Sequence, residues 1–394
     1  MSPSLDPKQN VSGISSVTQF IISNNPDCHY IHFELGRKDN ESGGLSRVKV
    51  IMKSLILWNR ILNSYPEALV HYNFPLSKMS ILRDPLFMMI ARWKRRKMVI
   101  HLHGGIFLTT PHIPKYLKCI LQSVFSFSFP CIVLSYLEKK LVVERFHCKN
   151  VYVLPNCVDL NNAKDFHREY LDNKNVLTLG YLGRIAETKG IEYLLEACVE
   201  LKRRNIPFVL RMAGKEEIEG QYLSRFQTEL GNSFIYEGVV FGQSKNIFLQ
   251  KINVFMLPSF FEGLPMSLLE SMSYGVVPVT TNVGSIGEIV KDGYNGLIIE
   301  KQDTMSIVEQ CVKLVYNKEL MNSLSQKARC TIFDRFHIAG YIDSLNSQIT
   351  EKSKIAYRIA LEVQDEMLLY QKSESNPQKL NIKAKKLAKK YKLK

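Results

Sequence analysis

The 394-residue sequence lacks several patterns that would assign it to a common class of protein. None of its eight cysteines forms a C-x-x-C pair, so no zinc site is expected, and most lie in apolar runs, as thiols buried in a reducing cytosol do. Residues 1–20 hold no basic stretch followed by an apolar core, which argues against a signal peptide. The longest apolar candidate, residues 119–134, is interrupted by Gln122 and Pro130 and falls short of the ~20 residues that span a bilayer.

Acidic residues are missing from the last 19 positions, residues 376–394, where eight lysines stand. About half of the net charge of +15 therefore belongs to this tail and not to the folded body. Leu380, Leu387 and Tyr391 fall at helical spacing among the lysines. Such a tail suits a membrane surface or nonspecific contact with nucleic acid, and an inert solubilising end fits equally well.

Apolar runs of strand length alternate with amphipathic stretches, which is the pattern of βα units and parallel sheets. Strands are expected at 29–33, 68–72, 98–102, 131–134 and 151–154, and after a polar linker (156–175) at 176–182, 208–213, 234–236, 254–257, 277–280 and 296–299. The clearest helical periodicities cover 48–62, 136–146, 191–202 and 221–230. Two α/β halves in series predict two Rossmann-like domains that face each other across a cleft.

The turn at residues 180–190 follows the first strand of the second half and opens a helix. Gly183 allows a close backbone approach, and a helix N-terminus offers unpaired N–H groups to an anion. Arg184 and Lys189 add two cations there, enough to neutralise a diphosphate. Because no G-x-G-x-x-G motif is present, a surface loop with incidental basic residues is the other interpretation of this turn alone.

Glu262 and Glu270 bracket a Gly/Pro turn that runs into an apolar helical pattern. One interpretation is a capping box, in which Ser267 and Glu270 satisfy backbone donors at the start of a helix. The other is functional, because ligands of doubly wound sheets bind beyond the carboxyl ends of the strands. Glu270 would then accept hydrogen bonds from ribose hydroxyls and Glu262 would face the other end of the ligand. Spacing alone leaves the two interpretations open.

A longer series of motifs resembles the donor-binding domain of the retaining glycosyltransferases of family 4, which have the GT-B fold. In order, the series is Gly183-Arg184, Lys189-Gly190, Ala213-Gly214, Glu237-Gly238, Pro258-Ser259, Glu262 through Glu270, Gly275, Pro278, Gly284, Glu288, Gly293 and Gly296. Fainter matches in the first half are Val11-Ser12-Gly13, His101-Leu102-His103-Gly104-Gly105, Ser135 and Pro155-Asn156-Cys157-Val158-Asp159. The resemblance covers residues 2–345, more strongly in the second half.

The resemblance implies an α/β GT-B protein with four parts. Residues 1–165 would bind the acceptor, residues 166–335 would bind the nucleotide-sugar donor, residues 336–372 would form helices that return toward the first domain, and residues 373–394 would be a disordered basic tail. The implied activity is a metal-independent, retaining transfer of a hexose from a nucleotide-diphosphate-sugar, the co-substrate, to a glycan or lipid-linked acceptor. No further cofactor is implied, and surface polysaccharide biosynthesis is the expected setting.

The resemblance also implies roles for individual residues. Arg184 and Lys189 would stabilise the charge that develops on the leaving diphosphate. Glu262 and His103 would contact the donor sugar, while His101 is expected to point elsewhere. The remaining implied ligand contacts are Glu270 on the ribose, Gly183, the loop residues Gly263, Leu264, Pro265 and Ser267, and on the acceptor side Gly13.

Two departures from the family pattern stand out. The family's Asn-Gly-Val-Asp has Cys157 in place of glycine, which disfavours positive φ in that turn. The family's first strand should precede Gly13, yet only about ten mostly polar residues do, with residues 1–3 resembling the end of such a strand. Either the given start lies downstream of the true one, or the first sheet lacks a central strand.

A basic segment suggests contact with a membrane. Residues 86–97 combine an apolar run with Trp93 and five cations, Arg92 and residues 94–97, which suits an interfacial helix on anionic lipid. A core helix that ends in a solvated basic turn is the alternative. For an enzyme with a lipid-linked acceptor, we expect a cytoplasmic protein on the inner face of the plasma membrane, with no specific nucleic acid partner.

Two other functions fit parts of the sequence. A noncatalytic nucleotide-sugar-binding or membrane scaffold protein would keep the donor site without the first strand. The joint presence of Arg184, Lys189, Glu262 and His103 favours the enzyme, because a scaffold does not need the full set. A GT-B epimerase fits the motifs less well than a transferase.

Overall fold

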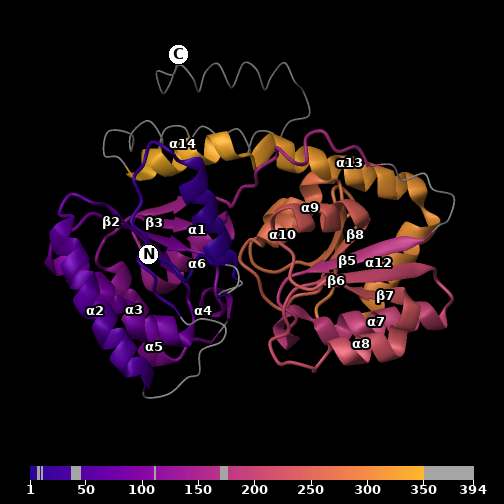
Figure 1. The fold of residues 1–394 in the computed structure, drawn as a ribbon, viewed down its shortest axis with the longest axis horizontal. Helices are drawn as coiled ribbons and strands as arrows, with labels where there is room; N and C mark the ends of the chain where they lie inside the picture. The colour runs from indigo at the N-terminus through magenta and orange to yellow at the C-terminus, as the bar shows by residue number, and fades with distance from the viewer. Residues whose placement is uncertain (7–8, 10–11, 37–45, 111, 169–175, 350–394) are drawn as a thin grey trace, which may run out of the picture. The chain divides into compact units, whose positions relative to one another are not determined.

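The computed structural model describes residues 1–349 apart from 7–8, 10–11, 37–45, 111 and 169–175. The chain forms two compact units, Met1–Tyr341 and Ile342–Lys394. The first unit contains two parallel sheets, of four and six strands (Figure 1). Of the second unit, only the end of helix α14 (Ile338–Ile349) is described, so the predicted tail at 373–394 and most of the predicted return at 336–372 lie outside the described residues.

The first sheet is parallel, in the order β1-β2-β3-β4. Its strands are β1 (Val70–Phe74), β2 (Met98–Leu102), β3 (Cys131–Val133) and β4 (Val151–Val153), close to four of the predicted ranges. The helices of this half are α1 (Gly13–Asn24), α2 (Ser46–Ser64), α3 (Lys78–Trp93), α4 (Ile106–Thr109), α5 (Lys115–Phe125) and α6 (Tyr136–Phe146).

The strand predicted at 29–33 is reduced to a single parallel bridge between Ser2 and Glu34. The backbone of Ser2 bonds to Phe33 on one side, and the carbonyl of Met1 accepts from the N–H of Asn73 in β1 on the other, at 3.2 Å. The first two residues therefore lie between β1 and the segment near Phe33, where the first strand was expected. Two residues cannot sustain a ladder, which explains why the predicted strand does not form.

Side chains along β1 and β2 alternate between an apolar face and a polar face of the first sheet. Val70, Tyr72 and Phe74 enter the core beneath α2, α3 and α5, together with the alternate residues of β2. His71, Asn73 and His101 occupy the other positions and are therefore on the opposite face. Buried polar side chains on a strand need partners, so this face has its own hydrogen-bond network.

The second sheet has the order β10-β9-β8-β5-β6-β7 and is parallel throughout. Its strands are β5 (Leu177–Leu182), β6 (Phe208–Ala213), β7 (Phe234–Tyr236), β8 (Val254–Leu257), β9 (Val277–Thr281) and β10 (Leu297–Ile299), which match the predicted ranges to within one residue. Its helices are α7 (Ile191–Arg203), α8 (Leu223–Leu230), α9 (Gly242–Lys251), α10 (Met266–Ser273), α11 (Ile286–Ile289), α12 (Thr304–Tyr316) and α13 (Lys318–Arg335).

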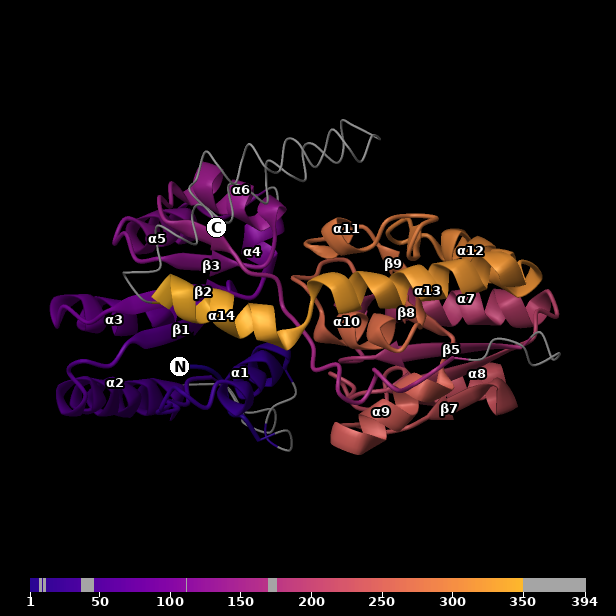
Figure 2. The same ribbon diagram turned by 90° about the horizontal axis from the view of Figure 1, so that it is seen from above.

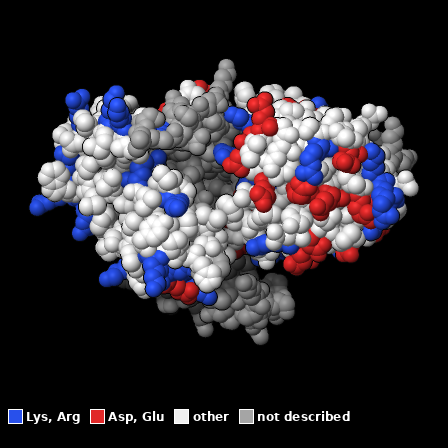
Figure 3. Space-filling view, turned by 90° about the horizontal axis from the view of Figure 1, so that it is seen from below, with Lys and Arg blue, Asp and Glu red and all other residues white. Residues whose placement is uncertain are grey.

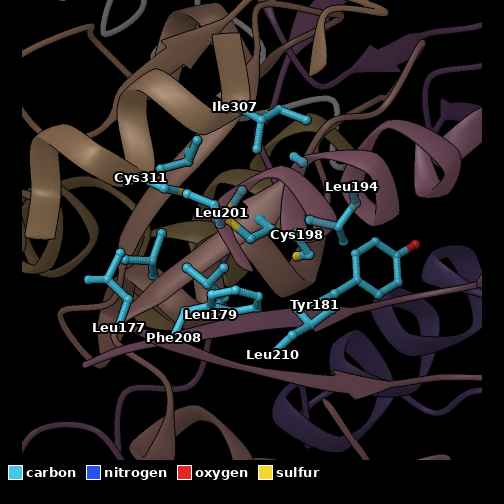
Figure 4. Close-up of a cluster of buried hydrophobic side chains, with 14 of the residues drawn as sticks. Leu177, Leu179, Tyr181, Leu194, Cys198, Leu201, Phe208, Leu210, Ile307 and Cys311 are labelled. Atoms are coloured by element: carbon cyan, nitrogen blue, oxygen red, sulfur yellow. The ribbon is translucent and has the colours of Figure 1, made fainter. Parts of the chain in front are cut away.

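Helices cover both faces of this sheet, as a buried parallel sheet requires (Figures 1 and 2). Leu177, Leu179 and Tyr181 of β5 pack with residues of α7 and α12 (Figure 4), and the same core includes residues of α8. Phe255 and Leu257 of β8 pack on the other side with α9, α10 and α13. The four predicted helices correspond to α2, α6, α7 and α8, with bounds that differ by at most two residues at each end.

Two smaller sequence features have plain outcomes. Cys157 is not among the residues with positive φ, so the turn that carries it does not need the family's glycine. Five of the cysteines are buried, and Cys28, Cys119 and Cys330 are exposed.

Candidate active site

The predicted donor residues follow two adjacent strands of the second sheet. β5 runs into the turn with Gly183 and Arg184, and β8 runs into the loop that carries Glu262 and ends at α10. Because β5 and β8 are paired in parallel, their carboxyl ends meet at the same edge. The fold thus brings together two motifs that are about 80 residues apart in the sequence.

Lys189 and Glu262 form an ion pair, with 2.6 Å between Nζ and Oε1. Lys189 ends a 3-10 turn (Glu187–Lys189) just before α7, and its side chain is one-quarter exposed. The hydroxyl of Ser259 donates to the same Oε1 at 2.7 Å, while the backbone of Phe260 bonds to Thr188. Glu262 is almost buried and is held by a cation and a hydroxyl, so its position is well defined.

Arg184 is oriented differently from Lys189. Its guanidinium lies 3.8 Å from the carboxylate of Glu217, and both side chains are about half exposed. Its carbonyl accepts a short hydrogen bond from the hydroxyl of Tyr181, which fixes the backbone of the turn. Gly183 donates its N–H to Ala213 across the sheet edge. The structure therefore brings Lys189 into contact with Glu262 and places Arg184 beside Glu217.

Glu270 lies on α10 and pairs with Lys245 of α9, with 2.6 Å between Nζ and Oε1. The capping-box interpretation of Glu270 is wrong, because α10 begins at Met266 with Pro265 as its N-cap and has no side-chain cap. Ser267 lies in the first turn of α10. The backbone donors of this turn are therefore the kind that binds anions at helix N-termini.

The loop before α10 is fixed by backbone contacts. The carbonyl of Gly263 accepts from the N–H of Ser285 at 3.0 Å, and the carbonyl of Leu264 accepts from the amide of Asn156 at 2.8 Å. Leu264 is buried. Both carbonyls are therefore occupied by protein donors.

His103 follows β2, and its Nε2 lies 2.6 Å from Oδ1 of Asn73. Burial lowers the pKa of His103 to about 3, so the ring is neutral at physiological pH. The expectation that His101 points elsewhere is wrong: the His101 and His103 rings lie next to each other, with centroids 4.1 Å apart and planes tilted by 32°. The physical reason is that residues two apart in an extended chain share a face. The His71 ring stacks on His101, with its Nε2 3.1 Å from Nδ1 of His101.

His103 also brings the two sheets of the first unit into contact at the site. A Cβ built on Gly104 would lie 2.5 Å from Cα of Gly263, and a Cβ on Gly263 would lie 2.8 Å from the carbonyl of His103. Gly104 also has φ of +77°, which favours glycine. The backbones of the predicted sugar-binding histidine and of the predicted donor loop therefore touch, with no room for side chains between them.

Two carboxylates that the sequence did not single out as site residues bridge the same region. Glu288 of α11 accepts from the N–H groups of Tyr136 and Leu137, at 3.1 and 2.7 Å, at the N-terminus of α6. Glu138 is buried, accepts from the N–H of Leu134 and is bonded to the hydroxyl of Ser285. Burial raises the pKa of Glu138 to about 7.

Gly13 is the first residue of α1, after the N-cap Ser12. A Cβ at Gly13 would meet nothing within 4 Å. Helix α1 contacts α10, so the element that Gly13 opens adjoins the donor loop. The structure gives no steric reason for glycine at this position.

Other residues of the site had little sequence signal. Lys245 is a single cation in a polar helix, and Asn73 is a single amide at the carboxyl end of a strand. The strand-end position was the one clue for Asn73. Among the described residues, no three His, Cys, Asp or Glu side chains converge as a metal centre would need.

Comparison with known proteins adds to this geometry. Residues 162–331 match the family model described as "Glycosyl transferases group 1". The UDP-Gal:alpha-D-GlcNAc-diphosphoundecaprenol alpha-1,3-galactosyltransferase of Escherichia coli is 26% identical over 312 residues, 75% of this chain and 78% of that enzyme. The capsular polysaccharide biosynthesis glycosyltransferase CapM of Staphylococcus aureus is 28% identical over 184 residues, 45% of this chain and 47% of that protein.

Two solved structures are similar in fold. A glycosyltransferase from Rickettsia africae has a TM-score of 0.61 at 18% identity, covering 82% of this chain and 85% of that one. Anabaena HepE in complex with UDP has a TM-score of 0.60 at 17% identity, covering 75% of this chain and 82% of that one. The two parallel sheets and these likenesses identify the fold as GT-B.

Proposed function

We propose that this chain, which belongs to the group 1 glycosyltransferases through residues 162–331, moves a sugar from a nucleotide-diphosphate-sugar to a lipid-linked glycan with retention of configuration. By its name, the Escherichia coli relative acts on a diphosphoundecaprenol-linked sugar, and the Staphylococcus relative acts in capsular polysaccharide biosynthesis. These names support a lipid-linked acceptor and a role in surface polysaccharide. A UDP-sugar is the first donor to test, since the same relative uses UDP-Gal and HepE is solved with UDP.

The proposed division of labour follows the two sheets. Residues 1–165 bind the acceptor, and residues 166–335 bind the donor. On the donor side, Glu270 holds the ribose, while Lys189 and Arg184 face the diphosphate. The N–H groups of residues 263–267 meet the sugar and the distal phosphate, which uses the uncapped N-terminus of α10. The acceptor approaches from the side of Gly13.

The proposed reaction needs no protein nucleophile. The bond between the anomeric carbon and the diphosphate oxygen breaks, and the acceptor oxygen bonds to that carbon on the same face. The acceptor's proton passes to the oxygen of the leaving diphosphate, so charge and atoms balance. Lys189 and Arg184 stabilise the negative charge that grows on the diphosphate, and Glu262 and His103 hold the sugar.

The observation that carries this proposal is the contact between Gly104 and Gly263. It places His103 of the first sheet against the loop that carries Glu262, which is itself paired with Lys189. A nucleotide-binding scaffold would require the donor loop, but it would not require a neutral histidine from the other sheet at the same point. The geometry therefore favours the enzyme.

The test is time-dependent release of nucleoside diphosphate from a panel of donors, with and without a polyprenyl-diphosphate-linked sugar. Acceptor-dependent release that Glu262→Ala abolishes and Glu200→Ala leaves intact supports the transferase. Glu200 is a suitable control because it lies near the end of α7, where it pairs with the exposed Arg203 and Arg204. Donor binding without release, for every donor and acceptor, would support the noncatalytic scaffold instead.

We also propose that the chain works on an anionic membrane surface at the cytoplasmic face. Helix α3 has two apolar faces: one enters the core, and on the other five residues are exposed by 43–80%. These are Met79, Leu82, Leu86, Met89 and Trp93. Their spacing places them in one stripe opposite the buried Ile81, Met88 and Ala91. Soluble helices normally keep that side polar.

Charge around the stripe fits anionic lipid. Residues 46–118 contain 13 lysines and arginines against two acidic residues, Glu67 and the buried Asp84. Figure 3 shows the same imbalance on one face, where Lys and Arg dominate over the first half of the chain and acidic side chains gather over the second. No helix in the described ranges is long and apolar enough to cross a bilayer. An apolar stripe beside cations is typical of an interfacial helix.

Vesicle sedimentation tests the membrane proposal. Met89→Ser with Trp93→Ser should weaken binding to phosphatidylglycerol vesicles by roughly tenfold or more. Tyr316→Ser, which changes a 72% exposed ring on α12, should leave binding unchanged. Deletion of residues 376–394 measures how much the tail contributes to vesicle binding. Sedimentation that neither change reduces would overturn the membrane proposal.

A further inference from the structure

The polar network behind His103 determines which of its ring nitrogens carries the proton. Asn73 of β1 is buried, and its amide nitrogen donates to the carbonyl of Met1 at 2.9 Å and to the hydroxyl oxygen of Thr18 at 3.3 Å. The Thr18 hydroxyl donates its own proton to the carbonyl of Ile14. Both partners of the Asn73 amide nitrogen therefore accept, which fixes the orientation of the amide group.

With the amide orientation fixed, Oδ1 of Asn73 faces Nε2 of His103 at 2.6 Å and can only accept. A neutral imidazole carries one proton, and here it must lie on Nε2. Nδ1 then keeps its lone pair, and within the described part of the chain no hydrogen bond to Nδ1 is found. The opposite tautomer would place two lone pairs 2.6 Å apart inside the protein, which is costly.

We propose that Asn73 is the positioning residue that makes His103 a hydrogen-bond acceptor toward the donor sugar, so that the site selects a sugar with a free hydroxyl at that point. The acceptor nitrogen is Nδ1. The inference rests on the proposed function for the identity of the ligand, but not for the tautomer. A sugar hydroxyl can donate to Nδ1, whereas an ether, a fluorine or a carboxylate oxygen at the same point cannot.

The surroundings keep His103 neutral. The titratable groups nearest it are His101, whose ring centroid lies 4.1 Å from that of His103, and His71, which is hydrogen-bonded to His101. The amino group of Met1 bonds the carbonyl of His71 at 2.7 Å, and Glu138 lies beyond Gly104. Burial lowers the pKa of all three histidines, so no imidazolium forms near neutral pH to turn Nδ1 into a donor.

The first test is the nitrogen NMR spectrum of the full chain labelled with ¹⁵N-histidine. The signals that disappear in His103→Gln belong to His103, and we expect them at the shifts of the Nε2–H tautomer at pH 7. Thr18→Val removes one of the two anchors of Asn73 and should leave that tautomer unchanged. Asn73→Leu should convert His103 to a mixture of tautomers. A wild-type His103 in the Nδ1–H form, or as imidazolium, would overturn the assignment.

The second test uses donor analogues in which each sugar hydroxyl is replaced in turn by hydrogen and by fluorine. Binding is measured as Kd, because fluorine itself slows cleavage at the anomeric carbon. At one hydroxyl, both replacements should weaken binding to the wild type about equally, by tenfold or more. In Asn73→Leu and in His103→Gln, replacing that hydroxyl should no longer weaken binding. If the fluorine analogue binds as well as the parent at every position, the acceptor role is wrong.

The two tests separate two kinds of failure. If no nucleotide-sugar binds at all, the proposed function fails while the tautomer of His103 is still measured. If donors bind and turn over but His103 is in the other tautomer, the transferase stands and the role of Asn73 is rejected.

Discussion

Lys189 lies 2.6 Å from Glu262, so the two residues that were expected to hold different ends of the donor are partners in the structure. Lys189 was assigned to the diphosphate and Glu262 to the sugar. Both assignments are compatible with the pair if the ammonium bridges from the carboxylate to a distal phosphate. Ser259 then supplies the second contact that holds Glu262 when the ligand draws Lys189 away.

This pairing makes Lys189→Met and Glu262→Gln interdependent. Each single change should lower kcat by about 10²-fold, as expected for loss of one preorganised group at the reacting centre. The double variant should be little worse than the worse single one, because residues that act as a unit are not additive. Steady-state kinetics of the four proteins tests this. Fully multiplicative losses would mean that the two groups act separately, and Arg203→Met, at an exposed ion pair, serves as the control.

The Glu270–Lys245 pair predicts an effect on donor affinity. Glu270→Gln should raise KM for the nucleotide-sugar by roughly tenfold, since hydrogen bonds to a charged group contribute about 1.5–3 kcal/mol, and kcat should change less. Lys245→Met should raise KM by a smaller factor, because it leaves the carboxylate without its nearby cation. Compared with the natural donor, a donor with 2′-deoxyribose should bind the wild type more weakly. The Glu270→Gln variant should bind the two donors equally well. If loss of the 2′-hydroxyl weakens binding to both proteins equally, Glu270 does not contact the ribose.

The sheets could be predicted from the sequence because parallel strands buried on both faces are short apolar runs. β5 to β10 were placed almost to the residue on that basis. The segment at 29–33 was also predicted as a strand, yet only the following residue, Glu34, forms a bridge, to Ser2, because strand formation depends on the neighbouring chain as well as on the residues themselves. Composition does not contain that information.

The site could be predicted only where residue types were grouped in the sequence. Lys189, Glu262 and His103 stood in recognisable motifs, whereas Asn73 and Lys245, which contact His103 and Glu270, are single residues with no local pattern. The contact between the His101 and His103 rings follows from the two-residue periodicity of an extended chain and could have been predicted. Spacing along a loop does not give side-chain direction, so the pairs of Lys189 with Glu262 and of Arg184 with Glu217 could not be predicted.

Glycine substitutions separate packing from function at two predicted positions. Gly104→Ala should destabilise the protein by roughly 1–3 kcal/mol and abolish activity, because a Cβ there overlaps Gly263 and φ is positive. Gly13→Ala should leave the unfolding free energy unchanged or raise it by up to about 1 kcal/mol, since the position begins a helix and faces open space. A raised KM for the acceptor in Gly13→Ala would therefore report on binding alone. If the acceptor kinetics are unchanged, Gly13 does not contribute to acceptor binding.

The buried carboxyl of Glu138 predicts a pH dependence of stability. Burial raises its pKa from 4.5 to about 7, so between these values the folded protein binds more protons than the unfolded chain. The free energy of unfolding must then fall as the pH rises from about 4.5 to 7, by roughly 3 kcal/mol from this group. Glu138→Gln keeps an acceptor oxygen for the N–H of Leu134 and a polar amide beside the Ser285 hydroxyl but does not titrate. Denaturant unfolding at pH 5 and pH 8 should show a smaller fall for this variant than for the wild type, whereas the control Glu200→Gln on α7 should behave like the wild type. If the wild type and Glu138→Gln lose stability equally over this range, Glu138 is ionised in the folded protein and its contact with Ser285 is a charge-assisted hydrogen bond.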